Sequence, residues 1–451
     1  MKKITNKVLW IFAVGQFGWS LLSGIISSWM VYYYTGEGAV FGSSITTGPL
    51  FLSVTLFGLI TAVGRLFDAV TDPLIAGWSD ASNFRGGRRI PFMKVIAIPF
   101  AVMTVGVFAF PATGSVIAND IILFITLMLF YLFMTIYCTP YNALIAELGD
   151  TQKNRINVST YISFTYIAGL SVAYLLPNLA GLFTASLGAA NAVRLAIAIL
   201  AAVAAIAMLV PSFFIRERDY IHSEPVKTKA FSSLFKSFKN KQFRRFVYSD
   251  VIYFFAVTLF QTGLAFYITR LMHASESNTF LLTVVMTVVS LCLYPVVNRL
   301  APKLGKKKII IVGFFAYAAV FLVASLCREG LWWGYLIAVL AGIPMAILGI
   351  LPQAVVADIA EADALTYGEQ RSGMFFAART FAMKLGQALS LLIFTSVTAF
   401  GTEFSYRMTA IIATVCCLVG AVLFFLYNEK AVMHTIVSAA KPESEASDGV
   451  S

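Results

Sequence analysis

The chain has 451 residues, of which 59% are hydrophobic and 12% are charged, and its mean hydropathy is +0.82. This composition leaves too few polar side chains to cover a soluble core, so it excludes a soluble enzyme or a soluble binding module. It predicts an all-α membrane protein whose surface faces lipid. The formal net charge of +11 raises the question of nucleic-acid binding.

Apolar stretches long enough to cross a bilayer recur along the chain. One crossing by an apolar helix takes about 20 residues. Twelve such helices are predicted, at about residues 10–34, 50–77, 91–111, 121–145, 158–182, 192–214, 246–268, 280–297, 309–326, 332–356, 374–400 and 408–427. The first stretch is too long for a cleavable signal peptide and lacks a small-residue cleavage site, so it is predicted to stay in the membrane.

The positive charge gathers on one side of the predicted membrane. With the N-terminus in the cytoplasm, about 26 of the 33 Lys and Arg residues fall in the tails and the loops after even-numbered helices, against about 4 in the opposite loops. The charge therefore indicates topology and not nucleic-acid binding. It predicts a multi-pass protein of the cell membrane with both termini in the cytoplasm.

A basic segment divides the chain into two halves. Residues 216–245 are predicted to be a cytoplasmic linker between helix bundles at 1–215 and 246–428, and residues 429–451 a disordered cytoplasmic tail. Two interpretations of the linker are open. Apolar side chains on one face would let a short helix lie on anionic headgroups, and the alternative is a solvated linker. The apolar residues are Phe231, Leu234, Phe235 and Phe238.

Catalytic and metal-binding motifs are missing from the sequence. The five cysteines fall in or at the ends of predicted helices without metal-ligand spacing, and the three histidines fall in loops or the tail. No nucleophile–base arrangement or nucleotide-binding glycine motif is present. The sequence therefore predicts no enzyme and no cofactor.

The two halves repeat a pattern at equivalent places. The loops after the second and eighth predicted helices each combine a polar helix end, a glycine and a basic cluster, and residues 140–147 correspond to 352–358. Such repeats are typical of transporters that bind substrate at the midplane between two bundles. We expect the repeated polar residues to form a conformational latch or gate. Its predicted members are Arg65, Asp80, Arg85, Arg88, Glu147, Asp358, Glu361 and Asp363.

Several segments, spread over nearly the whole chain, resemble one known family. They are residues 32–35, residues 64–73, Pro140 with Tyr141, and segments between 357 and 386. Together they resemble the glycoside–pentoside–hexuronide cation symporters, the melibiose-carrier branch of the major facilitator superfamily. The resemblance implies twelve transmembrane helices in two pseudo-symmetric six-helix bundles. It also implies a monomer among membrane lipids that imports a small molecule, a sugar or sugar acid, with H⁺ or Na⁺.

Two carboxylates lie deep in the second predicted helix. Asp68 and Asp72 are four residues apart and therefore share one helical face, and Arg65 lies on the same face. Charges at that depth are costly and are usually functional. We predict that both carboxylates bind the coupling cation, H⁺ or a sodium ion. The alternative is a structural network between Arg65 and the two acids. The resemblance adds Thr135 as a hydroxyl ligand.

The resemblance also implies a substrate site, from which this sequence departs. Ser20, Cys138, Asn142 and Ser163 replace an aspartate, a carboxylate, a tryptophan and an arginine of the sugar carriers, whereas Lys384 is kept. We expect Ser20 to have removed an acidic partner of Lys384. Trp19 and Tyr141 are predicted to stack on a sugar ring. The predicted substrate-binding residues are Trp19, Ser20, Tyr141, Asn142, Arg379, Thr380 and Lys384.

Arg379 is an additional cation in the eleventh predicted helix, and two hypotheses about it are open. It pairs with Asp358, Glu361 or Asp363 as an inner gate, because intramembrane charges usually pair. Alternatively, it binds a carboxylate, sulfonate or phosphate of the substrate through its planar guanidinium, with Lys384 as a second charge. The second hypothesis favours an acidic glycoside such as a hexuronide.

Three function classes stay open at this point. The first is a cation-coupled importer of a sugar or sugar acid. The second is a carrier of a lysolipid-like amphiphile, because lysophospholipid symporters resemble the same pattern in the second helix. The third, an intramembrane enzyme or receptor, lacks a nucleophile–base or metal constellation.

Overall fold

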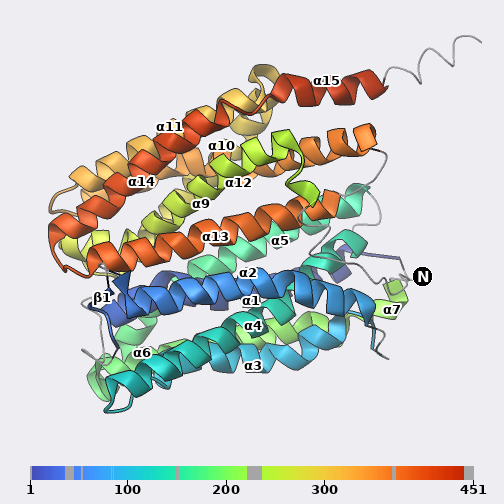
Figure 1. Ribbon diagram of the computed structural model, residues 1–451. Coiled ribbons are helices and arrows are strands. Elements are labelled where there is room, and N and C mark those ends of the chain that lie inside the picture. Colours follow the sequence, from blue (N-terminus) through green and yellow to red (C-terminus); the bar gives the residue numbers. More distant parts are fainter. Residues whose placement is uncertain are drawn as a thin grey trace, which may run out of the picture.

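The fold comes from a computed structural model, which describes residues 3–35, 45–51, 54–82, 84, 86–148, 152–220, 236–367 and 372–440. Long helices run side by side through the molecule, and α15 lies at the same end as the N-terminus (Figure 1). The first half contains α1 (Asn6–Thr35), α2 (Leu56–Ala81), α3 (Ile90–Ala109), α4 (Val116–Leu148), α5 (Gln152–Ala173), α6 (Leu176–Phe214) and the short α7 (Glu217–Tyr220). The second half contains α9 (Lys241–Phe266), η1 (Tyr267–Leu271), α10 (Asn278–Leu304), α11 (Lys306–Leu326), α12 (Trp332–Tyr367), α13 (Ser372–Thr398), α14 (Glu403–Phe424) and α15 (Glu429–Ala440).

The long helices account for twelve membrane crossings among the described residues. Ten helical runs are long and apolar enough to span a bilayer. One of them, Asn157–Phe214, has 58 residues, far more than one crossing needs. Its backbone leaves the helical conformation at Gly188, where φ is 74°, so it crosses twice. The remaining crossing is α2, whose four charged residues reduce its hydropathy. This confirms the predicted all-α membrane fold.

The helices form two bundles that repeat the same arrangement. In the first bundle, α1 packs against α5 and α6, and α3 packs against α4 and α6; in the second, α9 packs against α13 and α14, and α11 against α12 and α14. The bundles meet where α2 contacts α13, α5 contacts α10 and α1 contacts α9. When the two halves are exchanged, the α2–α13 contact becomes the α5–α10 contact, and the α1–α9 contact becomes itself. This is the expected pseudo-symmetry.

Close helix contacts repeat in the same way. A Cβ atom at Gly169 of α5 would come within 2.5 Å of the Phe17 carbonyl oxygen of α1, and one at Gly386 of α13 within 2.5 Å of the Val251 carbonyl oxygen of α9. Small residues let membrane helices approach each other closely. Both glycines therefore allow equivalent helices to meet backbone to backbone.

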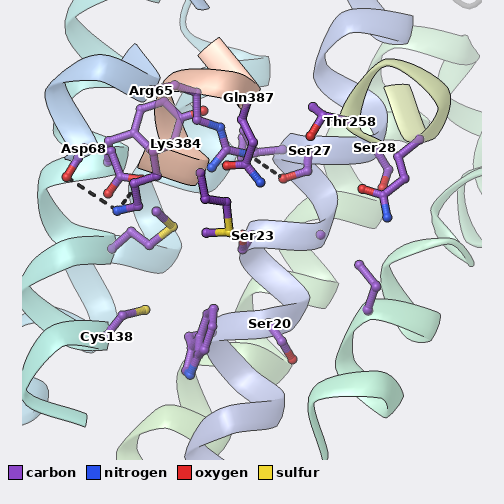
Figure 2. A pocket seen from close by; sticks show the side chains of 18 of the residues that line it. Ser20, Ser23, Ser27, Ser28, Arg65, Asp68, Cys138, Thr258, Lys384 and Gln387 are labelled. Carbon is purple, nitrogen blue, oxygen red and sulfur yellow. Dashed lines mark hydrogen bonds and ion pairs between the residues drawn. The ribbon is translucent and has the colours of Figure 1, made fainter. Parts of the chain in front are cut away.

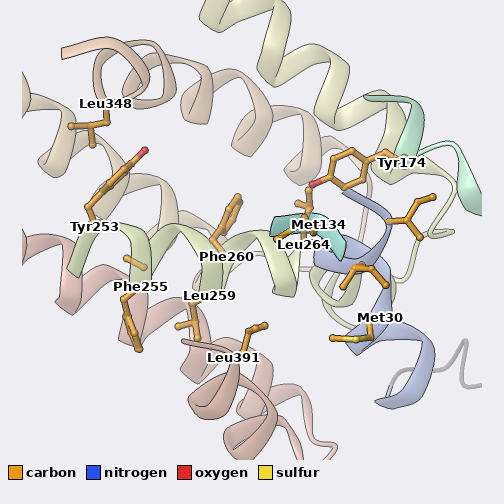
Figure 3. Packing of buried hydrophobic residues seen from close by; sticks show 14 of the residues in the cluster. Met30, Met134, Tyr174, Tyr253, Phe255, Leu259, Phe260, Leu264, Leu348 and Leu391 are labelled. Atoms are coloured by element: carbon orange, nitrogen blue, oxygen red, sulfur yellow. The ribbon is translucent and has the colours of Figure 1, made fainter. Parts of the chain in front are cut away.

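The core is apolar, and large apolar side chains also cover the outside. Figure 3 shows part of the core along α9, including Phe255, Leu259 and Phe260, all of them buried. Val95 is 73% exposed and Leu182 is 75% exposed. Such exposure is expected where the neighbouring medium is lipid and not water.

Two predicted boundaries are wrong. The second helix was expected from residue 50, but Pro49–Phe51 pairs with Val54–Thr55 in a small antiparallel hairpin, β1 and β2. The helix begins at Leu56 because Thr55 accepts a hydrogen bond from the Gly58 N–H as its N-cap.

The tail expected to be disordered from residue 429 begins with α15, which packs against α12. The predicted lipid-binding segment lies mostly outside the described residues, which omit 221–235.

Candidate functional site

A chamber lies between the two bundles. Its first cavity, of about 350 Å³, is lined by α1, α2, α4, α5, α9 and α13. A second cavity, of about 450 Å³, extends towards α10, α11 and α12 of the second bundle. Both cavities are lined by Tyr166, Gln261 and Gln387, so they adjoin. Cavities of this size accommodate small organic ligands.

An ion-pair cluster crosses the boundary between the bundles beside the first cavity. The Lys384 Nζ atom of α13 lies 2.8 Å from Asp68 Oδ2 of α2 (Figure 2). It also lies 2.6 Å from Asp72 Oδ2 of the same helix. The Asp68 side chain is 0% exposed and the Asp72 side chain 28% exposed. The two acids share a face of α2 as their spacing predicts. One ammonium group therefore bridges both carboxylates.

Hydroxyl groups of α4 support these carboxylates. Thr135 Oγ1 donates a hydrogen bond of 2.8 Å to Asp68 Oδ1, and Thr139 Oγ1 donates one of 3.4 Å to Asp72 Oδ1. Thr135 thus contacts the carboxylate near which the family resemblance placed it. Thr139 was missed, although it lies one helical turn after Thr135 and so on the same face.

The expectation that Lys384 has lost its acidic partner is wrong. Ser20 does stand on the cavity wall, but its hydroxyl donates to the Phe17 carbonyl oxygen of its own helix. Lys384 is neutralised instead by two acids of the other bundle. Sequence spacing gives no information about such a contact, because 312 residues separate Lys384 from Asp72.

Arg379 forms a second buried ion pair, with a partner that was not predicted. Its Nε atom lies 2.7 Å from Asp250 Oδ2, and its Nη2 atom donates to Asp250 Oδ1 at 3.0 Å. The exposed fractions of the two side chains are 10% and 3%. Asp250 belongs to α9, which packs against α13 within the second bundle. Both members of this pair are therefore on one side of the chamber.

The three predicted gate partners of Arg379 lie elsewhere, so the proposed pairing is wrong. Asp358 forms an ion pair of 2.5 Å with Lys306, Asp363 accepts a hydrogen bond from Asn240, and Glu361 is exposed. A sequence signal for the true partner existed. Asp250 is the only acidic residue of α9, and a buried intramembrane acid needs a basic partner.

Most of the predicted substrate-binding residues line the chamber. Trp19, Ser20, Asn142 and Thr380 line the first cavity, and Arg379 lines the second. Tyr141 does not line either one. It is fully buried, its hydroxyl donates to the Phe12 carbonyl oxygen, and its ring stacks on Phe12 at 4.2 Å. Neighbouring residues on a helix point about 100° apart, so Tyr141 faces α1 while Asn142 reaches the cavity.

Arg65, a predicted member of the latch, lines the chamber. It lines the first cavity, its Nη2 atom donates a 3.0 Å hydrogen bond to Ser27 Oγ, and its guanidinium lies 5.2 Å from the centre of the Tyr131 ring (Figure 2). Among the described residues, no carboxylate oxygen lies within ion-pair distance of it. The alternative of a direct Arg65–Asp ion-pair network is therefore wrong.

The predicted latch is described only in part. The side chains of Asp80 and Glu147 and all of Arg85 lie outside the described residues. The backbone N–H of Arg88 donates to Glu217 Oε1 at 2.8 Å, and that of Ile90 donates to Glu217 Oε2 at 2.9 Å. Glu217 is 3% exposed. Its carboxylate therefore caps the N-terminus of α3, where the helix dipole favours negative charge.

The second half repeats this cap. Glu429 accepts hydrogen bonds from the backbone N–H groups of Lys306 and Lys307 at the N-terminus of α11, at 2.7 and 3.0 Å. Glycines with positive φ precede both caps, Gly87 at 121° and Gly305 at 86°. The glycines and basic clusters were visible in the sequence repeat, whereas Glu217 and Glu429 were missed. Each follows the last helix of its bundle, far in sequence from the helix that it caps.

Comparison with known proteins agrees with this architecture. A family model described as MFS/sugar transport protein matches residues 11–437. The chain belongs to this family. It is therefore a membrane transporter and not an enzyme.

Three distant relatives match along most of their length. The chain is 25% identical over 404 residues to the uncharacterized symporter YnaJ of Bacillus subtilis, covering 86% of this chain and 82% of the relative. It is 23% identical over 407 residues to the isoprimeverose transporter of Lactiplantibacillus pentosus, covering 85% and 79%. It is 22% identical over 429 residues to sodium-dependent lysophosphatidylcholine symporter 1 of Xenopus tropicalis, covering 84% and 80%.

A solved structure shares the fold. The inward-facing, unoccupied bacterial homologue of the human lysosomal transporter Spinster superposes with a TM-score of 0.68 at 16% sequence identity, covering 97% of this chain and 99% of that one. This likeness supports the two-bundle fold of the major facilitator superfamily.

Proposed function

We propose that this protein is a cation-coupled symporter of a sugar or glycoside that works by alternating access. The observation that supports the proposal most strongly is the cluster in which Lys384 of one bundle bridges Asp68 and Asp72 of the other. An arriving cation competes with Lys384 for these carboxylates. Binding therefore changes the strength of a contact between the bundles, which is how a ligand shifts a conformational equilibrium.

The proton is the coupling ion that we propose. Cys138 lines the cavity beside Asp68 and Asp72, where the resemblance implies a third carboxylate. A thiol is a poor ligand for a hard cation such as Na⁺, which prefers oxygen. Protonation of a carboxylate needs no further ligand. The positive charge of the loops supports a cell-membrane location with both termini cytoplasmic.

A sugar is supported by the polar wall of the first cavity and by the likeness to the isoprimeverose transporter. Serines of α1 and the amides of Asn142 and Gln387 offer donors and acceptors for hydroxyl groups. Trp19 adds an aromatic face. These residues would orient a sugar ring next to the carboxylate cluster.

A second candidate substrate is a lysolipid-like amphiphile. The second cavity is lined largely by apolar side chains, including Phe254, Phe260, Met286 and Leu348. Such a wall fits an acyl chain or an apolar aglycone, and the chain is also similar to the lysophosphatidylcholine symporter.

Uptake by proteoliposomes tests these proposals. Labelled glycosides, sugar acids and lysolipids are supplied with an inward proton gradient, an inward sodium gradient or neither. We expect a glycoside to accumulate above its external concentration with the proton gradient. Accumulation of lysolipids alone would favour the second candidate, and a lack of gradient-driven accumulation for all probes would contradict symport.

A further inference from the structure

Arg65 occupies the chamber as a cation, and no carboxylate of the described residues pairs with it directly. Within the described part of the chain, it donates a hydrogen bond to the Ser27 hydroxyl and lies over the face of the Tyr131 ring. Its Nε atom is buried and has no hydrogen-bond partner. A buried donor without an acceptor is costly. The site is therefore short of an acceptor at Arg65.

The other charges of the chamber show when such an acceptor is needed. Two acids, Asp68 and Asp72, are balanced by two bases, Lys384 and Arg65, while Arg379 and Asp250 balance each other separately. The four-residue group is thus neutral as long as no coupling cation is bound. One bound cation gives it a net charge of +1. A net charge in a space of low dielectric constant is unfavourable.

We propose that the transported substrate carries an anionic group, a carboxylate or a phosphate, and that Arg65 binds it after the cation has bound. This inference rests on the proposed symport and adds the class of substrate. An anion restores neutrality, so each ligand raises the affinity for the other. The planar guanidinium suits a carboxylate or a phosphate, because it can donate two parallel hydrogen bonds.

The surroundings of Arg65 fit an anion better than those of Arg379. Ser23, Ser27 and Gln387 line the same cavity as Arg65 (Figure 2) and can donate hydrogen bonds to further oxygen atoms of a ligand. Arg379 already donates two hydrogen bonds to Asp250. An anion at Arg379 would have to displace that carboxylate and leave it buried without a partner, which is strongly unfavourable.

Binding of matched probes to the purified full-length protein tests the proposal. The sugar arm compares methyl glucuronide with methyl glucoside, and the lipid arm compares lysophosphatidylglycerol with monoacylglycerol. Each pair differs mainly in the anionic group. In at least one arm, the native protein should bind the acidic probe more tightly than the neutral probe. This difference in affinity should increase at the pH or sodium concentration that saturates the cation site. The arm that responds identifies the source of the anion.

Variants then assign the effect to Arg65. Arg65→Gln should weaken binding of the acidic probe about 10- to 100-fold, as expected for a charge-assisted hydrogen bond, and change the neutral probe little. Arg65→Lys should lose less of the affinity for the acidic probe. The double variant Arg379→Gln/Asp250→Asn is the matched control, since it removes a neutral pair, and should keep the preference.

Either of two binding results would overturn the proposal. One is that the native protein binds neither acidic probe more tightly than the matching neutral probe. This measurement does not depend on whether a variant folds. The other is that Arg65→Gln weakens binding of the acidic probe and of the neutral probe equally. Gradient-driven uptake of a neutral glycoside that survives Arg65→Gln would reject the anion site while leaving symport intact. A lack of cation-driven uptake for every probe would reject the proposed function itself.

Discussion

The two buried charge clusters of this protein look alike but differ in what they connect. Lys384 pairs with Asp68 and Asp72 across the boundary between the bundles, whereas Arg379 pairs with Asp250 inside the second bundle. Both have short distances and little exposure. Movement of one bundle relative to the other stretches the first cluster and leaves the second unchanged. We therefore expect the first cluster to control transport and the second to stabilise the fold.

The largest effect is expected from the boundary-crossing cluster. Asp72→Asn removes one of the two carboxylates for which Lys384 and the coupling cation compete. Gradient-driven accumulation of substrate should fall about 5- to 150-fold, the range of an allosteric coupling of about 1–3 kcal/mol. Substrate exchange without a gradient should persist. Glu329→Gln, at an acid whose side chain is 84% exposed, is the control, and full accumulation in Asp72→Asn would remove this cluster from the mechanism.

The second cluster should show the opposite behaviour. Arg379→Gln leaves Asp250 buried without its partner, so the free energy of unfolding should fall by about 3–5 kcal/mol. Arg379→Gln/Asp250→Asn removes both charges and should recover most of that loss. Thermal unfolding in detergent measures both. If the double variant is as unstable as the single one, the unpaired charge of Asp250 is not the cause of the lost stability.

A smaller effect is expected at the two repeated helix caps. Glu217→Gln and Glu429→Gln each remove a negative charge that accepts hydrogen bonds at a helix N-terminus. Each should lower the free energy of unfolding by about 1–2 kcal/mol, and the effects should add because the caps lie in different bundles. Equal losses are expected from the pseudo-symmetry. A loss at one cap alone would show that the two caps contribute differently to the free energy of unfolding.

Sequence patterns predicted the features that depend on local spacing. Hydropathy located the long helices, and the four-residue spacing of Asp68 and Asp72 placed both carboxylates on one face of α2. The run from Asn157 was also predicted as two crossings, because the sequence shows separate apolar stretches at about residues 158–182 and 192–214. These predictions rest on helix geometry, which is the same in any context.

Features that depend on contacts between distant segments were not predicted. Lys384 and Asp72 are brought together only by the packing of α2 on α13, and Arg379 and Asp250 only by that of α9 on α13. Tyr141 was predicted to stack on a sugar ring in the cavity, yet its position on α4 turns it towards α1. In each case the residue type indicated a role and the partner came from tertiary structure.

Substrate-driven cation movement tests the account most directly. Proteoliposomes containing the native protein and a pH-sensitive dye receive a transported glycoside from outside, with no ion gradient imposed. The inward substrate gradient should acidify the lumen in the native protein and should not do so in Asp72→Asn, which still exchanges substrate. Acidification that persists in Asp72→Asn, or native uptake that moves neither H⁺ nor Na⁺, would contradict the assignment of the Asp68–Lys384–Asp72 cluster as the coupling site.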